Sequence, residues 1–221
     1  MGVQTELTAA DGHRLGAYRA GPADARAGLV VIQEIFGVNA HMRRVADQFA
    51  AVGYAVIAPA LFDRAERGIE LGYLPQDVQK GMELRSKITH EQAMMDIAAA
   101  AAALGVAKAG IVGYCWGGSL AWSGATETEL FASASGWYGG MIVKTKDAVP
   151  HCPVQLHFGE TDHSIPLADV EALRAAQPNI PIYTYPAGHG FGCEDRASYS
   201  PECAALAQSR TLEFFAKYLL V

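Results

Sequence analysis

Hydrophobic residues occur in short runs that alternate with longer segments of helical periodicity. Apolar runs of strand length lie at 28–33, 54–58, 109–114, 131–138, 153–158 and 180–185. Helical patterns lie between or after them, at 40–52, 89–105, 116–124, 167–176 and 204–220. Continuous apolar runs are typical of strands buried on both faces, and strands that alternate with helices favour a parallel sheet. The pattern therefore predicts an α/β fold with a mostly parallel, doubly wound sheet covered by helices on both faces.

Two segments depart from this alternation. Residues 6–15 and 16–20 surround an Asp-Gly turn at 10–12, which predicts an antiparallel hairpin at the sheet edge. Residues 60–90 mix charges, glycine and aromatic side chains without a clear period. We expect an irregular loop and one helix there, forming a wall or lid over a site. No repeat or linker is visible, so we expect a single domain over residues 1–221.

The composition is that of an ordinary globular protein. Of the 221 residues, 51% are hydrophobic and 18% are charged, and the net charge is −6 at pH 7. A negative balance argues against nucleic acid as a partner. The N-terminal segment lacks the apolar core of a signal peptide, and the longest apolar run, 97–107, is far shorter than a membrane span. We therefore expect a soluble cytoplasmic protein without nucleic acid or membrane partners.

Residues 113–117, Gly-Tyr-Cys-Trp-Gly, lie between a predicted strand and a predicted helix. Their spacing is that of the G-x-S-x-G nucleophile elbow, with Cys115 in place of serine. The two glycines are expected to allow a close approach of strand and helix, and the helix N-terminus favours a thiolate at Cys115. An inert buried cysteine is one alternative. A phosphate-binding loop is another, although its spacing and lysine are missing.

Two further candidates also follow predicted strands. Asp162 comes after the run 153–158, and His189 comes after the run 180–185. The carboxyl ends of parallel strands meet at one edge of a sheet, so Cys115, Asp162 and His189 are expected to converge there. Their order along the chain, nucleophile then acid then histidine, is that of α/β-hydrolases. His189 is then the candidate base and Asp162 the acid that orients it.

Some neighbouring residues allow other interpretations. Asp162 could instead cap the helix 167–176, and Glu160 and His163 are close rivals by sequence. If Asp162 points at the site, these two rivals should point elsewhere. His157 lies inside a predicted strand, so we expect it to be a core residue with satisfied hydrogen bonds.

The four cysteines, at 115, 152, 193 and 203, show no C-x-x-C spacing. The sequence therefore predicts no metal cluster and no redox pair, and we expect free thiols in a reducing compartment. Cys193 lies four residues after His189 and is a candidate modulating thiol.

Acyl transfer also requires donors that stabilise the oxyanion of the tetrahedral intermediate. The backbone N–H of Trp116, directly after the nucleophile, is one candidate. The backbone N–H of Ile35, in the loop after the run 28–33, is the second. Glu34 lies at the same strand end and is either a surface acid or part of the site.

Four motifs together resemble the dienelactone hydrolase (carboxymethylenebutenolidase) family. They are QEIFGVN at 33–39, GYCWGG at 113–118, GETDHSIP at 159–166 and AGHGF at 187–191, in the family's order. The resemblance implies an α/β-hydrolase fold, no cofactor, no metal, and a small ester or lactone as the molecule bound. It also implies a monomer, with a dimer as the alternative.

Carried over residue by residue, the resemblance assigns the triad and oxyanion roles to the candidates already named. It also gives Glu34 a role: in the family, the equivalent acid holds the resting thiol in an inactive pose until substrate displaces it. Such a device protects a reactive thiolate from oxidation.

The substrate is less well indicated than the reaction. Members that cleave dienelactones carry two arginines for the substrate carboxylate, and the corresponding positions here hold Gly81 and Cys193. Lys80 lies beside the first of these positions, and Arg85 and Arg196 are nearby but not in register. These three cations and Arg64 are the candidates for substrate binding.

The resulting hypothesis is a hydrolase of small lactones and esters that uses a cysteine nucleophile, a Cys-His-Asp triad and an acyl-enzyme. A broad carboxylesterase or thioesterase for neutral small esters is the alternative within enzymes. A redox-responsive thiol protein without hydrolytic turnover is the alternative of another class.

Overall fold

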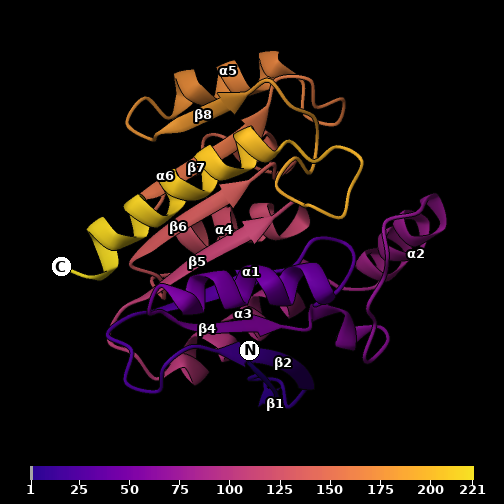
Figure 1. Cartoon of the computed structure of the whole chain (residues 1–221), viewed down its shortest axis with the longest axis vertical. Helices are drawn as coiled ribbons and strands as arrows, with labels where there is room; N and C mark the ends of the chain where they lie inside the picture. The colour runs from indigo at the N-terminus through magenta and orange to yellow at the C-terminus, as the bar shows by residue number, and fades with distance from the viewer. Residues whose placement is uncertain (1) are drawn as a thin grey trace. The chain divides into compact units, whose positions relative to one another are not determined.

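The computed structural model describes residues 2–221, which divide into two compact units (Figure 1). The first unit ends at Gly110, and the second is Ile111–Val221. Within the described residues there are eight strands and six α-helices, in an alternating order. This order confirms the predicted α/β class.

The strands of the first unit are arranged in the order β1-β2-β4-β3. Their bounds are β1 Val3–Thr8, β2 Arg14–Ala20, β3 Gly28–Ile32 and β4 Ala55–Pro59. β1 and β2 form the predicted antiparallel hairpin, β2 is antiparallel to β4, and β3 is parallel to β4. Every residue of β3 and β4 is buried, as their continuous apolar runs predict.

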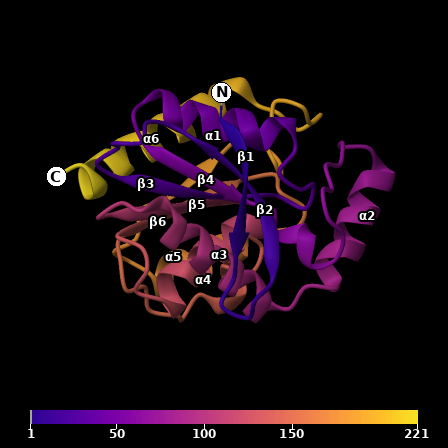
Figure 2. The same ribbon diagram turned by 90° about the horizontal axis from the view of Figure 1, so that it is seen from below.

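Helices α1 (Ala40–Ala51) and α3 (His90–Leu104) cover opposite faces of these strands (Figure 2). Both begin at strong caps. The Asn39 side chain accepts a hydrogen bond from the Met42 N–H in α1. Thr89 and Gln92 form a reciprocal capping box at α3.

Residues 60–90 contain the predicted helix, α2 (Pro75–Ser86), and also a short 3₁₀ helix, η1 (Leu61–Arg64). Between η1 and α2 the chain is irregular, as predicted, and it packs on the loop after β3. The Leu71 N–H donates to the Phe36 carbonyl over 2.9 Å, and the rings of Phe36 and Tyr73 lie 4.6 Å apart, edge to face. These long-range contacts leave no periodic signal in the sequence.

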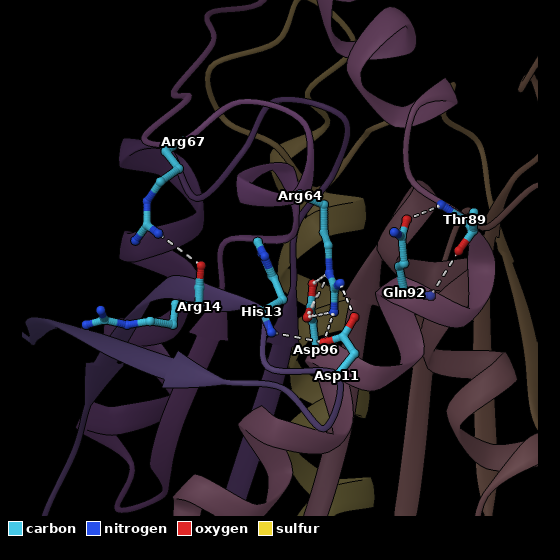
Figure 3. A network of polar contacts seen from close by, with 8 residues as sticks. All are labelled: Asp11, His13, Arg14, Arg64, Arg67, Thr89, Gln92 and Asp96. Atoms are coloured by element: carbon cyan, nitrogen blue, oxygen red, sulfur yellow. Dashed lines mark hydrogen bonds and ion pairs between the residues drawn. The ribbon is translucent and has the colours of Figure 1, made fainter.

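Arg64 lies at the centre of a buried polar cluster in the first unit (Figure 3). Its guanidinium forms an ion pair of 2.7 Å with Asp96 of α3 and a second ion pair with Asp11 in the β1–β2 turn. The Arg64 side chain is only 6% exposed, and that of Asp96 is fully buried. Burial raises the pKa of Asp96 even though Arg64 lies beside it. The cluster joins the hairpin, η1 and α3.

We expect Arg64→Leu to lower the free energy of unfolding by about 3–5 kcal/mol, because it leaves the buried Asp96 carboxylate without a counter-ion. Urea unfolding monitored by circular dichroism measures this loss. The loss should shrink as the pH falls, because protonation of Asp96 removes the uncompensated charge. The matched control is Arg67→Leu, since Arg67 is exposed and pairs with Glu6 at 3.2 Å; such pairs contribute about 0–1 kcal/mol. Equal effects of the two substitutions would contradict the interpretation.

The second unit continues the alternation of strands and helices. β5 (Ala109–Tyr114) begins two residues before the unit boundary and lies mostly in this unit. The other elements are α4 Trp116–Glu127, β6 Ser133–Trp137, β7 Val154–Gly159, α5 Leu167–Ala176, β8 Ile182–Tyr185 and α6 Pro201–Leu219, with a short 3₁₀ helix, η2, at Val143–Thr145. The strand order is β5-β6-β7-β8, and β7 is parallel to both β6 and β8. Helices α4 and α6 lie on opposite faces of these strands (Figures 1 and 2).

The boundaries of α6 differ from the prediction. The helix begins at Pro201, three residues before the predicted start at 204. Proline suits the first helical position for two reasons. Its fixed φ is helical, and a backbone N–H at that position would have no acceptor within the helix, so its absence costs no hydrogen bond. No helix in residues 2–221 is both long enough and apolar enough to cross a membrane.

Candidate active site

Cys115 occupies a sharp turn between β5 and α4. Its backbone angles, φ 56° and ψ −114°, lie outside the regions that non-glycine residues favour. Such a conformation costs on the order of 1–3 kcal/mol and persists only where the surroundings enforce it. A Cβ at Gly113 would lie 1.9 Å from the Gly117 carbonyl oxygen, so no side chain fits at position 113. The turn therefore has the geometry that the elbow motif predicts for strand, nucleophile and helix.

The second unit brings Cys115, His189 and Asp162 together. His189 Nε2 lies 3.1 Å from Cys115 Sγ, and His189 Nδ1 lies 2.7 Å from Asp162 Oδ2. The Asp162 side chain is fully buried, whereas that of His189 is 22% exposed. A carboxylate only accepts hydrogen bonds, so Nδ1 donates to Asp162 and Nε2 is left to exchange a proton with the sulfur.

The other interpretations of this segment do not match the structure. Helix α5 is preceded by Pro166, without a side-chain cap, so Asp162 does not cap it. The second Asp162 oxygen, Oδ1, accepts a 2.8 Å hydrogen bond from the Ser164 N–H, which fixes the carboxylate. The rivals Glu160 and His163 are both exposed.

The pKa of His189 reflects two opposing influences. Burial alone would lower it, but the hydrogen bonds to Asp162 and Cys115 outweigh burial and raise the pKa to about 10. The imidazolium form is therefore stabilised at neutral pH. The Nε2 atom of this imidazole lies 3.1 Å from Cys115 Sγ, within reach for proton exchange with the sulfur.

His157 is a core residue with satisfied hydrogen bonds, as predicted. The Thr211 hydroxyl donates its one hydrogen to the Ala207 carbonyl, so it must accept from His157 Nε2 at 3.2 Å. His157 Nδ1 then accepts from the Tyr185 hydroxyl at 2.8 Å. Burial, helped by the charge of Arg210, lowers the pKa of His157 to about 3, so the ring is neutral.

The two predicted oxyanion donors lie in different units. Trp116 is the first residue of α4, where backbone N–H groups point out of the helix. Ile35 and Glu34 lie in the first unit, in the loop directly after β3, and both are buried. A Cβ at Gly81 of α2 would lie 2.0 Å from the Ile35 carbonyl oxygen. The helix therefore packs its backbone on this loop, which explains why position 81 carries no side chain.

The four predicted substrate-binding cations have different surroundings. Arg64 is buried in the cluster with Asp11 and Asp96, so its donors serve protein carboxylates, which argues against a role in substrate binding. Lys80 of α2 forms a 2.7 Å ion pair with Glu66.

Arg85 and Arg196 are both partly exposed. Arg85 is on α2 in the first unit. Arg196 lies in the second unit, and its guanidinium covers Gly190, the residue after His189. A Cβ at Gly190 would come within 2.4 Å of Arg196 Nη1. Arg196 thus lies beside the backbone of the loop that carries His189.

The four cysteines differ in their exposure. All four are free thiols; Cys193 and Cys203 are buried, and Cys115 and Cys152 are partly exposed. In residues 2–221, no group of three or more His, Cys, Asp or Glu side chains could hold a metal ion. A modulating role for Cys193 stays a prediction.

Two residues that contact His189 were not predicted from the sequence. The Ser198 hydroxyl donates a 2.7 Å hydrogen bond to the His189 carbonyl, and the Tyr138 ring packs against the imidazole with the ring centroids 5.2 Å apart. Tyr138 is the last residue of the predicted strand 131–138 and precedes two glycines, which indicated the end of the strand but not a contact with His189; β6 ends one residue earlier, at Trp137.

Comparison with known proteins identifies the class and then the family. A strand-elbow-helix nucleophile with an acid and a histidine after later strands defines an α/β-hydrolase. An esterase from Pyrococcus furiosus has the same fold, with a TM-score of 0.75 at 14% identity, covering 99% of this chain and 92% of that chain. The family model described as "Dienelactone hydrolase family" matches residues 15–219, so the chain belongs to the dienelactone hydrolase family.

Relatives of higher identity agree with this assignment. The carboxymethylenebutenolidase of Pseudomonas putida is 35% identical over 221 residues, covering 93% of this chain and 92% of the relative. A crystal structure from Klebsiella pneumoniae, provisionally named a dienelactone hydrolase, is 32% identical with a TM-score of 0.84, covering 99% of this chain and 100% of that chain. The chain is therefore a hydrolase of the dienelactone hydrolase type.

Proposed function

We propose that this hydrolase cleaves small lactones and esters through a Cys115-His189-Asp162 triad and a thioester acyl-enzyme. The observation that supports the proposal most directly is the continuous series of hydrogen bonds from Cys115 Sγ through the His189 imidazole to Asp162. In this series each group has the partner that nucleophilic catalysis requires.

In the first half-reaction, His189 Nε2 holds the proton of the Cys115 thiol, and the sulfur electron pair attacks the substrate carbonyl carbon. A carbon–sulfur bond forms, and the carbonyl π electrons move to oxygen. The backbone N–H groups of Trp116 and Ile35 are proposed to donate to this oxyanion. Collapse breaks the ester carbon–oxygen bond, and the leaving oxygen takes the proton from His189. In a lactone this step opens the ring.

In the second half-reaction, His189 accepts a proton from water while the water oxygen attacks the thioester carbonyl. The carbon–sulfur bond then breaks, Cys115 leaves as a thiolate, and the carboxylic acid is released. The sum of both halves is ester plus water giving acid plus alcohol. Asp162 keeps the imidazole in the tautomer that both halves need.

Glu34 is proposed to hold the resting thiol in an inactive pose until substrate displaces it. Its support is the family resemblance, together with the burial of a carboxylate next to the proposed donor Ile35. Buried carboxylates are rare unless a partner or a function retains them.

Two substrate classes are candidates. An anionic lactone is favoured by Arg196, whose guanidinium lies on the residue after His189. A neutral ester is favoured by the absence of side-chain donors at Gly81 and of a guanidinium at Cys193, which is fully buried.

The experiment compares hydrolysis of an anionic dienelactone with that of p-nitrophenyl acetate. We expect the lactone to be cleaved with the higher kcat/KM. Arg196→Met should raise KM for the lactone alone by about tenfold or more, since a hydrogen bond to a charged group contributes about 1.5–3 kcal/mol. Lys144→Met removes an exposed cation of the same unit and should leave the KM for both substrates unchanged.

If p-nitrophenyl acetate is the better substrate and Arg196→Met has no effect, the proposed substrate class becomes the neutral ester in place of the anionic lactone. Hydrolysis of neither compound would reject the proposed function.

A further inference from the structure

Tyr138, directly after β6, has an unusual backbone. Among the non-glycine residues of 2–221, only Cys115 and Tyr138 have a positive φ, 56° and 39° respectively. An L-residue in the left-handed region is strained, and such strain persists where the surrounding structure enforces it. The candidate nucleophile and Tyr138 share this property.

Contacts with the nucleophile elbow enforce the turn at Tyr138. The Cys115 N–H donates a 2.9 Å hydrogen bond to the Trp137 carbonyl, and the Tyr138 N–H donates one of 2.7 Å to the His157 carbonyl. A Cβ at Gly118 would lie 2.3 Å from the Trp137 oxygen, so this turn packs directly on the first turn of α4. The backbone of Tyr138 is therefore fixed relative to Cys115.

This backbone places the Tyr138 ring against the histidine. The ring is fully buried, and its centroid lies 5.2 Å from that of His189 at an interplanar angle of 62°. The same ring contacts Phe191, two residues further along the loop, at 5.4 Å and 68°. Both contacts have the edge-to-face geometry that aromatic pairs favour. One ring thus contacts the histidine loop at two places.

We propose that Tyr138 is a positioning residue that acts through His189. Its ring limits the motion of the imidazole, so that Nε2 stays 3.1 Å from Cys115 Sγ while Nδ1 stays 2.7 Å from Asp162. Because Tyr138 is tied to the elbow through β6, the ring sets the histidine relative to the sulfur. The inference rests on the proposed function, in which His189 exchanges a proton with Cys115.

A smaller side chain at position 138 gives the imidazole more rotamer freedom. Both hydrogen bonds are then formed for a smaller fraction of the time, so His189 is less often placed to exchange a proton with Cys115. The restraint on the imidazole comes from the ring of Tyr138 and not from its phenol oxygen. Phenylalanine should therefore keep the function of the ring, and leucine should lose it.

The test measures alkylation of Cys115 by iodoacetamide between pH 5 and pH 9, followed by the mass of the Cys115 peptide. Alkylation needs the thiolate and no ester turnover. Every variant keeps Glu34, so an inactive resting pose lowers all the rates alike, and the ratio of two rates reports the contact between His189 and Cys115. For Tyr138→Leu, we expect the rate at pH 6 to fall about tenfold or more relative to wild type, because His189 takes up the thiol proton for a smaller fraction of the time. Ester kcat should fall about ten- to a hundredfold with little change in KM. Tyr138→Phe should stay within about threefold of wild type in both assays.

Phe215→Leu removes another fully buried ring of the same unit, from α6, and serves as the control for lost packing. It should lower the melting temperature as Tyr138→Leu does, without moving the alkylation profile. A wild-type profile in folded Tyr138→Leu would overturn the inference, as would equal losses in the Phe and Leu variants. If wild type hydrolyses no ester but the alkylation profiles separate as expected, the proposed function fails and the positioning role stands.

Discussion

Replacement of Cys115 by alanine is expected to reduce kcat/KM for lactones and esters by about 10⁴-fold or more, as loss of a catalytic nucleophile does in other triad hydrolases. Cys115 Sγ is the group that His189 Nε2 contacts at 3.1 Å, and alanine has no electron pair to attack the carbonyl. The oxyanion donors would remain, so a small residual rate above that in water is expected. The rate of p-nitrophenol release measures the effect.

The matched control for this substitution is Cys152→Ala. Cys152 is also a partly exposed free thiol of the second unit, but burial raises its pKa to about 11, so it stays protonated. Its replacement should leave the rate unchanged. Wild type mixed with the acetate ester and quenched with acid should carry an acetyl group on the Cys115 peptide. Full activity in Cys115→Ala would show that another residue is the nucleophile.

The parts of the site that the sequence predicts depend on local patterns. The elbow needs glycine at position 113, because a Cβ there would meet the Gly117 carbonyl, and this requirement is visible as a motif. Asp162 and His189 could be located because each follows an apolar run, and parallel strands bring their carboxyl ends to one edge. His157, by contrast, lies within a strand, and its position there correctly predicts a core residue.

The parts that the sequence does not predict depend on contacts between distant segments. Arg64 pairs with Asp11, 53 residues away, and with Asp96, 32 residues away, and no spacing rule connects the three. Its charge alone suggested substrate binding. The left-handed φ of Tyr138 likewise results from packing against α4, and tyrosine has no preference for that conformation. The close contact between α2 and the Ile35 carbonyl is likewise not predictable from the sequence, because it forms only when the loop after β3 has folded.

Asp162→Asn is expected to lower kcat by about 10⁴-fold, the effect that this change has in a Ser-His-Asp site. Asparagine fits the same space, and its oxygen can still accept from the Ser164 N–H as Oδ1 does at 2.8 Å. Its amide nitrogen would then face His189 Nδ1, where a donor opposes the Nδ1–H tautomer. The imidazole would carry its proton on Nε2 and could not accept one from Cys115.

The conservative change at the neighbouring acid, Glu160→Gln, is the control, because Glu160 is exposed and should not affect kcat. A loss below about tenfold in Asp162→Asn would contradict the role of Asp162 as the orienting acid, since the wrong tautomer alone should cost far more.

Asp162→Asn should also change how stability depends on pH. The pKa of His189 is about 10 in the folded protein, against about 6.5 for an unperturbed histidine. The folded state thus binds the proton more tightly, so this stabilisation is fully present below about pH 6.5 and is lost as the pH rises through about 10. Since the Asp162 hydrogen bond raises that pKa, the variant should lose much of this contribution. The difference in melting temperature between wild type and variant should therefore be largest near pH 6 and decrease toward pH 10. A difference that is constant over this range would mean that Asp162 stabilises the fold without stabilising the imidazolium.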